Sequence, residues 1–213
     1  DKIIMESSKN VINNIFKEET FIEIPTHIKL TLRSHHLMNN SSFKFVCGTN
    51  LLKSNMFFRR LWKINFLDSF FLNDVILLGV GWKTYSQNTE FFTKRLWNRI
   101  LSNDKIHSVR DEYTKQKLNE IGITNVINTS CPTMWTLDPD HCKEIPQERS
   151  SNVVATITDY RKDHKRDRIM FQKLIDNYKN VYIWPQSYND IKYIKTLNIS
   201  DTIEILSPNL NSY

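Results

Sequence analysis

The sequence is poor in cysteine and has no long apolar run, and each shortage narrows the classes of protein that fit it. Three cysteines, Cys47, Cys131 and Cys142, are spaced irregularly among the 213 residues. An odd number at this spacing fits neither a disulfide framework nor a zinc site, so we expect a reducing compartment. Charged and polar residues interrupt each apolar stretch before the roughly 18 residues that a membrane-spanning helix needs. The composition therefore predicts a soluble globular protein.

Positive charge is in excess, and it suggests an anionic partner. The net charge is +6 and the pI is about 9.1, which leaves nucleic acid, phosphorylated metabolites and acidic lipid surfaces open. The 29 lysines and arginines are scattered along the chain. Their densest cluster, residues 161–168, contains two aspartates and leads into a predicted helix. Such a cluster is more typical of a solvated loop than of a nucleic-acid surface, so we expect no nucleic-acid partner.

Residues 106–135 hold the clearest local pattern. An apolar run at 105–109 suits a buried strand, and Arg110-Asp111 follows it directly. From Asp111 the apolar residues fall at helical spacing until Gly122, and residues 125–129 read as the next strand. The stretch is thus predicted to be one βαβ unit. Ligands of parallel sheets bind outside the carboxyl ends of the strands, where Ser108, Arg110 and Asp111 would lie.

The rest of the first 140 residues continues this alternation. Apolar and aromatic side chains predict helices at 3–16, 54–70 and 89–101, and strands at 20–24, 43–47 and 74–82. Together they predict a parallel, doubly wound sheet. The chain begins directly with a helix, whereas such a domain normally starts with a strand and a turn. We therefore expect the first strand to lie outside the given sequence.

A second domain is predicted after a polar linker. Residues 137–151 contain two prolines and show no periodicity, which gives domains at 1–140 and 152–213 joined by a linker at 141–151. Strands are predicted at 152–158, 181–184 and 202–206, and helices at 168–178 and 188–197. A doubly wound domain usually has five or six strands, so we expect this domain to be incomplete in the chain.

Small and aromatic residues after the predicted strands are candidate ligand contacts. Gly48-Thr49-Asn50 would let the backbone approach an anion, although an ordinary strand exit explains it as well. Gly81 could make room for a ligand or merely turn the chain, and Trp82 with Tyr85 could face a sugar or pack a helix. In the second domain, Gln186 and Ser187 are candidate donor contacts, with a helix cap at Ser187 as the alternative.

The sequence resembles the polysaccharide pyruvyl transferase family. The resemblance rests on HSVRDEYTKQKL (107–118) and INTSCPTMW (127–135), with LLGVGW (77–82) upstream at ordered spacing. It implies two facing Rossmann-like domains of the GT-B type. It also implies transfer of the enolpyruvyl unit of phosphoenolpyruvate onto a sugar diol as a ketal, with no further cofactor. The basic histidine and lysine that the family carries later in its second domain have no matching position here.

The chemistry of that donor favours Arg110 as the central residue. Phosphoenolpyruvate carries a carboxylate close to a phosphate, and a guanidinium binds either group bidentately while staying protonated. Asp111 would orient Arg110 or cap the following helix. His107 is expected to be a packed or hydrogen-bonded histidine, and the histidines lack ligand spacing, so no metal is predicted.

Other partners and functions stay open at this point. A sugar or lipid-linked oligosaccharide would be the acceptor, which places the protein in the cytoplasm and brings it to the inner face of the membrane. A nucleotide-sugar glycosyltransferase with the same two-domain cleft is an alternative, as is a non-catalytic glycan-binding member of the fold. The sequence does not decide the oligomeric state.

Overall fold

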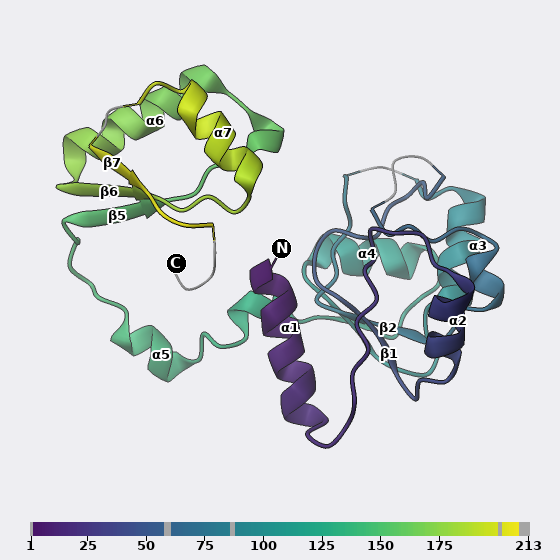
Figure 1. Cartoon of the computed structure of the whole chain (residues 1–213). Coiled ribbons are helices and arrows are strands. Elements are labelled where there is room, and N and C mark those ends of the chain that lie inside the picture. Colours follow the sequence, from purple (N-terminus) through teal and green to yellow (C-terminus); the bar gives the residue numbers. More distant parts are fainter. Residues whose placement is uncertain (1, 58–60, 86–87, 200–201, 209–213) are drawn as a thin grey trace. The chain divides into compact units, whose positions relative to one another are not determined.

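The computed structural model describes residues 2–57, 61–85, 88–199 and 202–208, and it divides the chain into two compact units, Asp1–Cys142 and Lys143–Tyr213 (Figure 1). Each unit is α/β with small parallel sheets, which agrees with the predicted class. The arrangement as two doubly wound GT-B domains stays a prediction. The helices of the first unit are α1 (Lys2–Ile15), α2 (Leu32–Asn39), α3 (Phe91–Ile100) and α4 (Glu112–Glu120), with short 3-10 turns η1 (Asp68–Phe70) and η2 (Pro132–Met134), and α5 (Pro139–Glu144) spans the boundary between the units.

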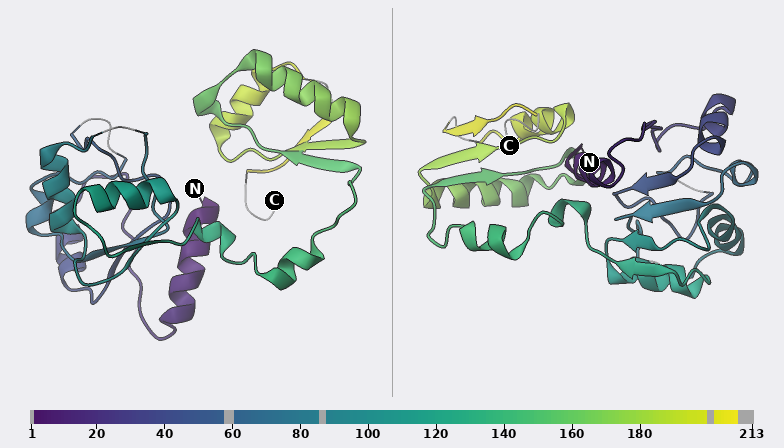
Figure 2. Two further views of the ribbon diagram at one scale, coloured as in Figure 1. Left: turned by 180° about the vertical axis from the view of Figure 1, so that it is seen from behind. Right: turned by 90° about the horizontal axis from the view of Figure 1, so that it is seen from below.

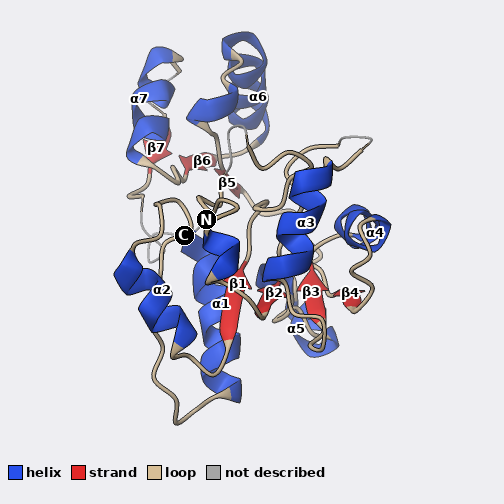
Figure 3. Ribbon diagram, turned by 90° about the vertical axis from the view of Figure 1, so that its right-hand side faces the viewer, coloured by secondary structure: helices blue, strands red, loops and turns tan. Residues whose placement is uncertain are grey.

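Four parallel strands form the sheet of the first unit. They are β1 (Lys44–Cys47), β2 (Val75–Leu78), β3 (His107–Val109) and β4 (Val126–Asn128), and β1 pairs with β2 as β3 pairs with β4. The two pairs meet through a bridge between Val80 and Val109, where Gly79 N donates to Ser108 O at 3.0 Å. The strands therefore lie side by side in chain order (Figure 3). Because all four strands run parallel, their carboxyl ends lie at one edge of the sheet.

His107 joins β2 to β3 through its side chain. The ring is fully buried, its Nδ1 accepts from Leu77 N at 3.2 Å, and its Nε2 lies 2.8 Å from Ser102 O. Nδ1 can accept only when it carries no proton, so Nε2 carries the hydrogen and donates to Ser102. Burial, opposed by the bond to Ser102, lowers the pKa of His107 below 6.5. The prediction of a hydrogen-bonded histidine is confirmed.

Helices α3 and α4 form where the sequence predicts helices. Helix α3 buries Thr93, Leu96, Trp97 and Ile100 on one face. Helix α4 is capped by Asp111, whose carboxylate accepts from Thr114 N at 2.7 Å, and the chain turns at Gly122, where φ is 93°. The apolar core of this unit lies against the sheet and includes Leu52, Trp62, Ile64, Leu77, Trp97, Ile100 and Leu118.

Two predictions for the first unit are wrong. Residues 20–24 are described and form no strand; Phe21 and Ile22 are exposed, and no described strand pairs with this segment. The described part of 54–70 is no helix and contains only η1. Asn55 and Asn65 explain this difference, because their side chains accept backbone N–H bonds at 2.9 and 2.7 Å and so stabilise turns instead.

Two helices were not predicted from the sequence. Helix α2 is preceded by Thr31, which forms a reciprocal cap with Ser34. Helix α5 occupies residues 139–144, within the stretch 137–151 that shows no periodicity, and it overlaps the linker predicted at 141–151. Proline at its first position and Asp138, whose carboxylate accepts from His141 N at 2.7 Å, are typical of a helix start.

The second unit holds three parallel strands and two helices. Strands β5 (Asn152–Ala155), β6 (Asn180–Ile183) and β7 (Ile203–Ile205) pair in the order β5-β6-β7 (Figure 2). Helices α6 (His164–Asn177) and α7 (Tyr188–Thr196) lie on the same face of this sheet (Figures 1 and 3), as right-handed crossovers require. Phe171, Ile183, Tyr193, Ile194 and Leu197 are its most buried core residues.

Candidate functional site

Close packing covers two of the glycines at the carboxyl edge of the first sheet. A β-carbon placed on Gly48 would lie 2.1 Å from Cγ2 of Ile4, which belongs to α1. One placed on Gly79 would lie 2.3 Å from Cδ of Pro132, at the start of η2. Both glycines also have positive φ, 58° and 63°. The side chains of Ile4 and Pro132 thus occupy the space that a side chain at residue 48 or 79 would need. Glycine is required at both positions by the packing of the chain itself.

Arg110, Gly81 and Asn50 meet at the same edge. Arg110 Nη1 donates to Asn50 Oδ1 at 3.3 Å, and a β-carbon on Gly81 would lie 2.2 Å from that oxygen and 2.4 Å from Arg110 Cδ. Asn50 is exposed and Arg110 is half-buried. Among the described residues, no carboxylate lies within ion-pair distance of Arg110. Its guanidinium thus keeps most of its donors for another acceptor.

The loop that carries Asn50 is tied to the extension of β2. Gly81 N donates to Thr49 O at 2.8 Å, and Leu52 N donates to Gly81 O at 3.1 Å. Thr49 has a φ of 49°, a conformation that β-branched residues rarely adopt. The ladder that continues on both sides of Thr49 holds it there. Thr49 thus acts through its backbone, which fixes Asn50 beside Arg110.

Ser108 and Asp111 stabilise the strand ends around Arg110 through hydrogen bonds. Ser108 Oγ accepts from Gly79 N at 3.0 Å and lies 2.5 Å from Thr129 Oγ1, so it joins three consecutive strand ends. Asp111 Oδ1 caps α4 and also accepts from Thr114 Oγ1 at 2.7 Å, while that hydroxyl accepts from Trp82 N at 2.8 Å. Of the two roles considered for Asp111, the cap is the one observed. Both side chains position the strand end that carries Arg110.

Trp82 lies inside the core, where it cannot stack on a sugar. It is 5% exposed, and its indole Nε1 donates to Ser54 Oγ at 3.1 Å. The alternative of packing is therefore correct, and Trp82 leaves the candidate binding set. Tyr85 is exposed and its ring lies 4.7 Å from that of Tyr113 on α4. This pair is the aromatic surface that the described residues offer beside α4.

Gln186 and Ser187 follow β6 at the carboxyl edge of the second sheet. Both are exposed, and Ser187 caps α7 by accepting from Asp190 N at 3.3 Å. Asp190 is buried and accepts from Asp159 N at 2.8 Å and from Ser187 N at 2.8 Å. One carboxylate thus holds the loops after β5 and β6 together. The hydroxyl of Ser187 is engaged in the cap, whereas the side chain of Gln186 is exposed.

Sequence reasoning missed three supporting residues, Thr114, Thr129 and Asp190. Two of them had a signal: Thr114 stands three residues after Asp111 and Asp190 stands three after Ser187, which is the spacing of a helix cap and its third residue. Thr129 had none, because its contact with Ser108 depends on the register of β3 against β4. The described residues hold no group of three or more His, Cys, Asp or Glu side chains suited to a metal ion, and no described helix is long and apolar enough to cross a bilayer.

Comparison with known proteins gives one match. The model of a family described as polysaccharide pyruvyl transferase matches residues 1–212, almost the whole chain. No curated protein and no solved structure matches the sequence significantly.

Proposed function

Because the chain belongs to the polysaccharide pyruvyl transferase family, we propose that it transfers the pyruvyl group of phosphoenolpyruvate onto two hydroxyls of a sugar as a ketal. The family match supports a transferase that acts on a polysaccharide or its precursor. The donor and the ketal product are our inference. Since phosphoenolpyruvate is an intracellular metabolite, the proposal places the reaction in the cytoplasm.

The unpaired guanidinium of Arg110 is the observation that carries the donor assignment. It lies at the carboxyl edge of a parallel sheet, where ligands of such sheets bind. Among the described residues, only the neutral Asn50 accepts from it, at 3.3 Å. A planar guanidinium with free donors matches the carboxylate or the phosphate of phosphoenolpyruvate in a bidentate contact. Gly81, which has no side chain, leaves the space that the Arg110 side chain occupies. Gln186, exposed at the second sheet edge, is kept as a further candidate contact to the donor.

The proposed reaction needs cations more than it needs a nucleophile on the protein. Protonation of the methylene carbon makes C2 of the donor electrophilic, and two sugar hydroxyls then form C–O bonds to C2 while the bond from C2 to the phosphate oxygen breaks. One hydroxyl proton is balanced by the proton added to the methylene carbon, and the other leaves with phosphate. Arg110 would offset the negative charge of the carboxylate or of the departing phosphate.

Direct titration of phosphoenolpyruvate tests the donor assignment. A charge-assisted bidentate contact contributes roughly 1.5–3 kcal/mol, so Arg110→Ala should weaken binding by about ten- to a hundredfold. Arg110→Lys keeps the charge but loses the planar fork, and its loss should be smaller. Arg33→Ala, which removes an exposed arginine from α2, is the matched control and should bind as the unmodified chain does.

Two outcomes would contradict the proposal. Unchanged donor affinity in a folded Arg110→Ala protein would remove Arg110 from the site, and thermal unfolding shows whether the protein is folded. Binding of a uridine or guanosine diphosphate in place of phosphoenolpyruvate would instead favour a nucleotide-sugar glycosyltransferase. Binding of a glycan without any donor would favour the non-catalytic alternative.

A further inference from the structure

Helix α3 and the segments beside it expose an unusual number of apolar side chains. We define the α3 face by Phe57, Phe66, Leu67, Phe70, Phe91, Phe92, Arg95 and Arg99. The six apolar members are between 37% and 71% exposed, although five are phenylalanines. They are contiguous: Phe57, Phe66, Leu67 and Phe92 line one cavity of about 300 Å³, and the Phe66 ring contacts that of Phe70 at 5.7 Å. Contiguous exposed apolar surface of this kind marks an interaction site.

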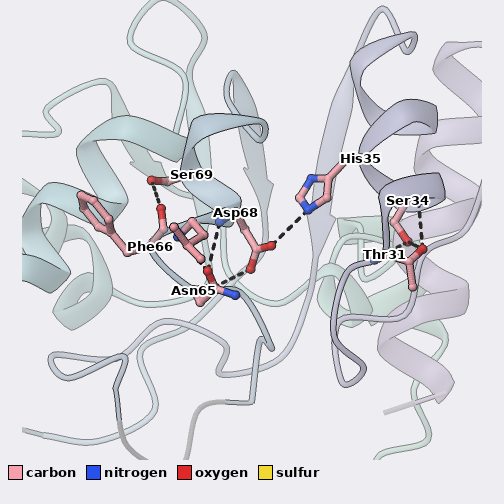
Figure 4. A network of polar contacts seen from close by, with 8 residues as sticks. Thr31, Ser34, His35, Asn65, Phe66, Asp68 and Ser69 are labelled. Carbon is pink, nitrogen blue, oxygen red and sulfur yellow. Dashed lines mark hydrogen bonds and ion pairs between the residues drawn. The ribbon is translucent and has the colours of Figure 1, made fainter.

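The face is held in place by a polar network. Asn65 Oδ1 accepts from Leu67 N at 2.7 Å, and Asp68 Oδ2 accepts from Asn65 N at 2.7 Å. Asp68 also contacts His35 Nε2 on α2 at 3.0 Å (Figure 4). Asp68 is buried, so these bonds fix the turn between Trp62 and η1 from inside. The same turn presents Phe66, Leu67 and Phe70 to solvent, and their exposure is therefore a property of an ordered segment.

Positive charge accompanies the apolar side chains. The guanidinium of Arg95 lies 4.7 Å from the centre of the Phe91 ring, and that of Arg99 lies 4.0 Å from the centre of the Phe70 ring. Arg99 Nε also donates to Ser69 O at 3.0 Å, which holds the side chain against the face. Helix α3 contains no acidic residue, and no described carboxylate pairs with either arginine. Each arginine thus keeps donors for an external anion.

We propose that the α3 face docks on a phospholipid bilayer that contains anionic lipids. The phenylalanines and Leu67 would enter the boundary between headgroups and acyl chains, and Arg95 and Arg99 would pair with lipid phosphates. The charge pattern favours this occupant over a second copy of the chain. A symmetric contact through the α3 face would bring the arginines of two copies together, and the carboxylate beside the face, that of Glu90, already accepts from Asn55 Nδ2. The inference does not depend on the chemistry of the donor.

Vesicle co-sedimentation tests the proposal with the whole chain. The protein should bind vesicles of phosphatidylcholine mixed with phosphatidylglycerol more tightly than vesicles of phosphatidylcholine alone, and added salt should weaken the binding. Arg95→Gln with Arg99→Gln should reduce binding to the anionic vesicles by roughly 25-fold, since each basic residue near such a surface contributes about fivefold. Phe57→Ser with Phe92→Ser should reduce binding to both kinds of vesicle.

Matched variants separate the α3 face from general charge and hydrophobicity. Lys165→Gln with Arg166→Gln removes two exposed charges from α6, and Tyr160→Ser with Tyr188→Ser removes two aromatics that are 80% and 69% exposed in the second unit. Both control pairs should bind vesicles as the unmodified chain does. All variants should keep their thermal unfolding transition and their affinity for phosphoenolpyruvate, whatever that affinity is.

Three results would overturn the proposal. The first is no binding to anionic vesicles. The second is binding that the two α3-face pairs and the two control pairs reduce equally, which would indicate general attraction to the basic chain. The third is concentration-dependent self-association without vesicles that Phe57→Ser with Phe92→Ser abolishes. That result would show that the face is an interface between copies.

Discussion

Arg110 packs directly on Gly81: a β-carbon at residue 81 would lie 2.4 Å from Arg110 Cδ and 2.9 Å from its Cγ. Contacts this short do not occur between real side chains, so the arginine holds its position because residue 81 has no side chain. The two residues come from the ends of neighbouring strands, and their backbones are linked where Arg110 N donates to Val80 O at 3.1 Å. The strand can therefore shift little to accommodate a larger residue.

Gly81→Ala should displace the Arg110 side chain. We expect a loss of donor affinity of about tenfold or more, because the charge-assisted contact of Arg110 is worth roughly 1.5–3 kcal/mol. The control is Gly122→Ala: φ is 93° there, and outside the adjacent residues the nearest atom to the new β-carbon, Asn98 Oδ1, lies 3.9 Å away. It should lower stability by about 1 kcal/mol through backbone strain and leave donor affinity unchanged. Equal affinity in both variants would show that Gly81 has no role in binding.

Thr114→Val should destabilise the first unit. The buried hydroxyl of Thr114 accepts from Trp82 N at 2.8 Å and donates to Asp111 Oδ1 at 2.7 Å. Valine keeps the shape but leaves a buried N–H without an acceptor, which costs about 1–3 kcal/mol. Urea denaturation measures the loss. Thr114→Ser keeps the hydroxyl and should lose less, whereas equal losses would mean that the methyl group matters more than the hydrogen bonds.

Stability should fall as the solution becomes mildly acidic, because His107 stays neutral in the folded chain. Burial is the main cause that lowers its pKa below 6.5. Below about pH 6.5 the unfolded chain binds a proton that the folded chain does not. The free energy of unfolding therefore decreases as the pH is lowered, until the pH reaches the pKa of His107 in the folded chain. The decrease is at most about 1.4 kcal/mol per pH unit. Denaturation from about pH 7 to about pH 5 checks this slope.

The same experiment on His107→Gln isolates the histidine. Glutamine does not titrate, so the variant should be less stable overall but should show a flatter profile in this range. An identical slope in both proteins would assign the pH dependence to other groups. Nitrogen NMR of the labelled ring would show the proton on Nε2 directly, with the urea-unfolded chain as the reference that titrates near 6.5.

Asp190→Ala should loosen the carboxyl edge of the second unit. The carboxylate accepts from Asp159 N, Gln186 N and Ser187 N at 2.8, 3.1 and 2.8 Å. Losing a buried acceptor of this kind costs at least about 1–3 kcal/mol. Limited proteolysis should then cut faster in the loops after β5 and β6. Asn189→Ala, at the exposed neighbouring position, is the control and should be cut at the original rate.

The spacing of apolar residues correctly predicted the helices and strands whose apolar side chains all face the core. Strand β2, helices α3 and α4, and the βαβ unit from β3 to β4 all follow from apolar spacing and from the charge and glycine at their ends. The pattern failed at 54–70, because its aromatic residues divide between the core, where Trp62 lies, and the surface, where Phe57 lies. Apolar spacing alone does not reveal which side an aromatic residue faces.

The candidate site was predictable in part. Strand ends of one parallel sheet share an edge, so Asn50, Gly81 and Arg110 could be grouped from sequence before any contact was known. The cover that Ile4 provides over Gly48 could not, because it depends on how α1 packs on residues more than forty positions away. The burial of Trp82 depends likewise on Ser54 and Thr114, which reach it from other segments.

The junction between β2 and β3 restricts which amino acids the chain can tolerate. Elsewhere in the sheet, strands pair through main-chain groups that every residue except proline possesses. Here the imidazole of His107 replaces a main-chain acceptor for Leu77, and the hydroxyl of Ser108 shares the N–H of Gly79. Pairing at this junction therefore uses these two side chains in addition to main-chain hydrogen bonds. A deep mutational scan should find positions 107 and 108 far less permissive than Val126 or Ile127 on the neighbouring strand, even for substitutions that preserve volume.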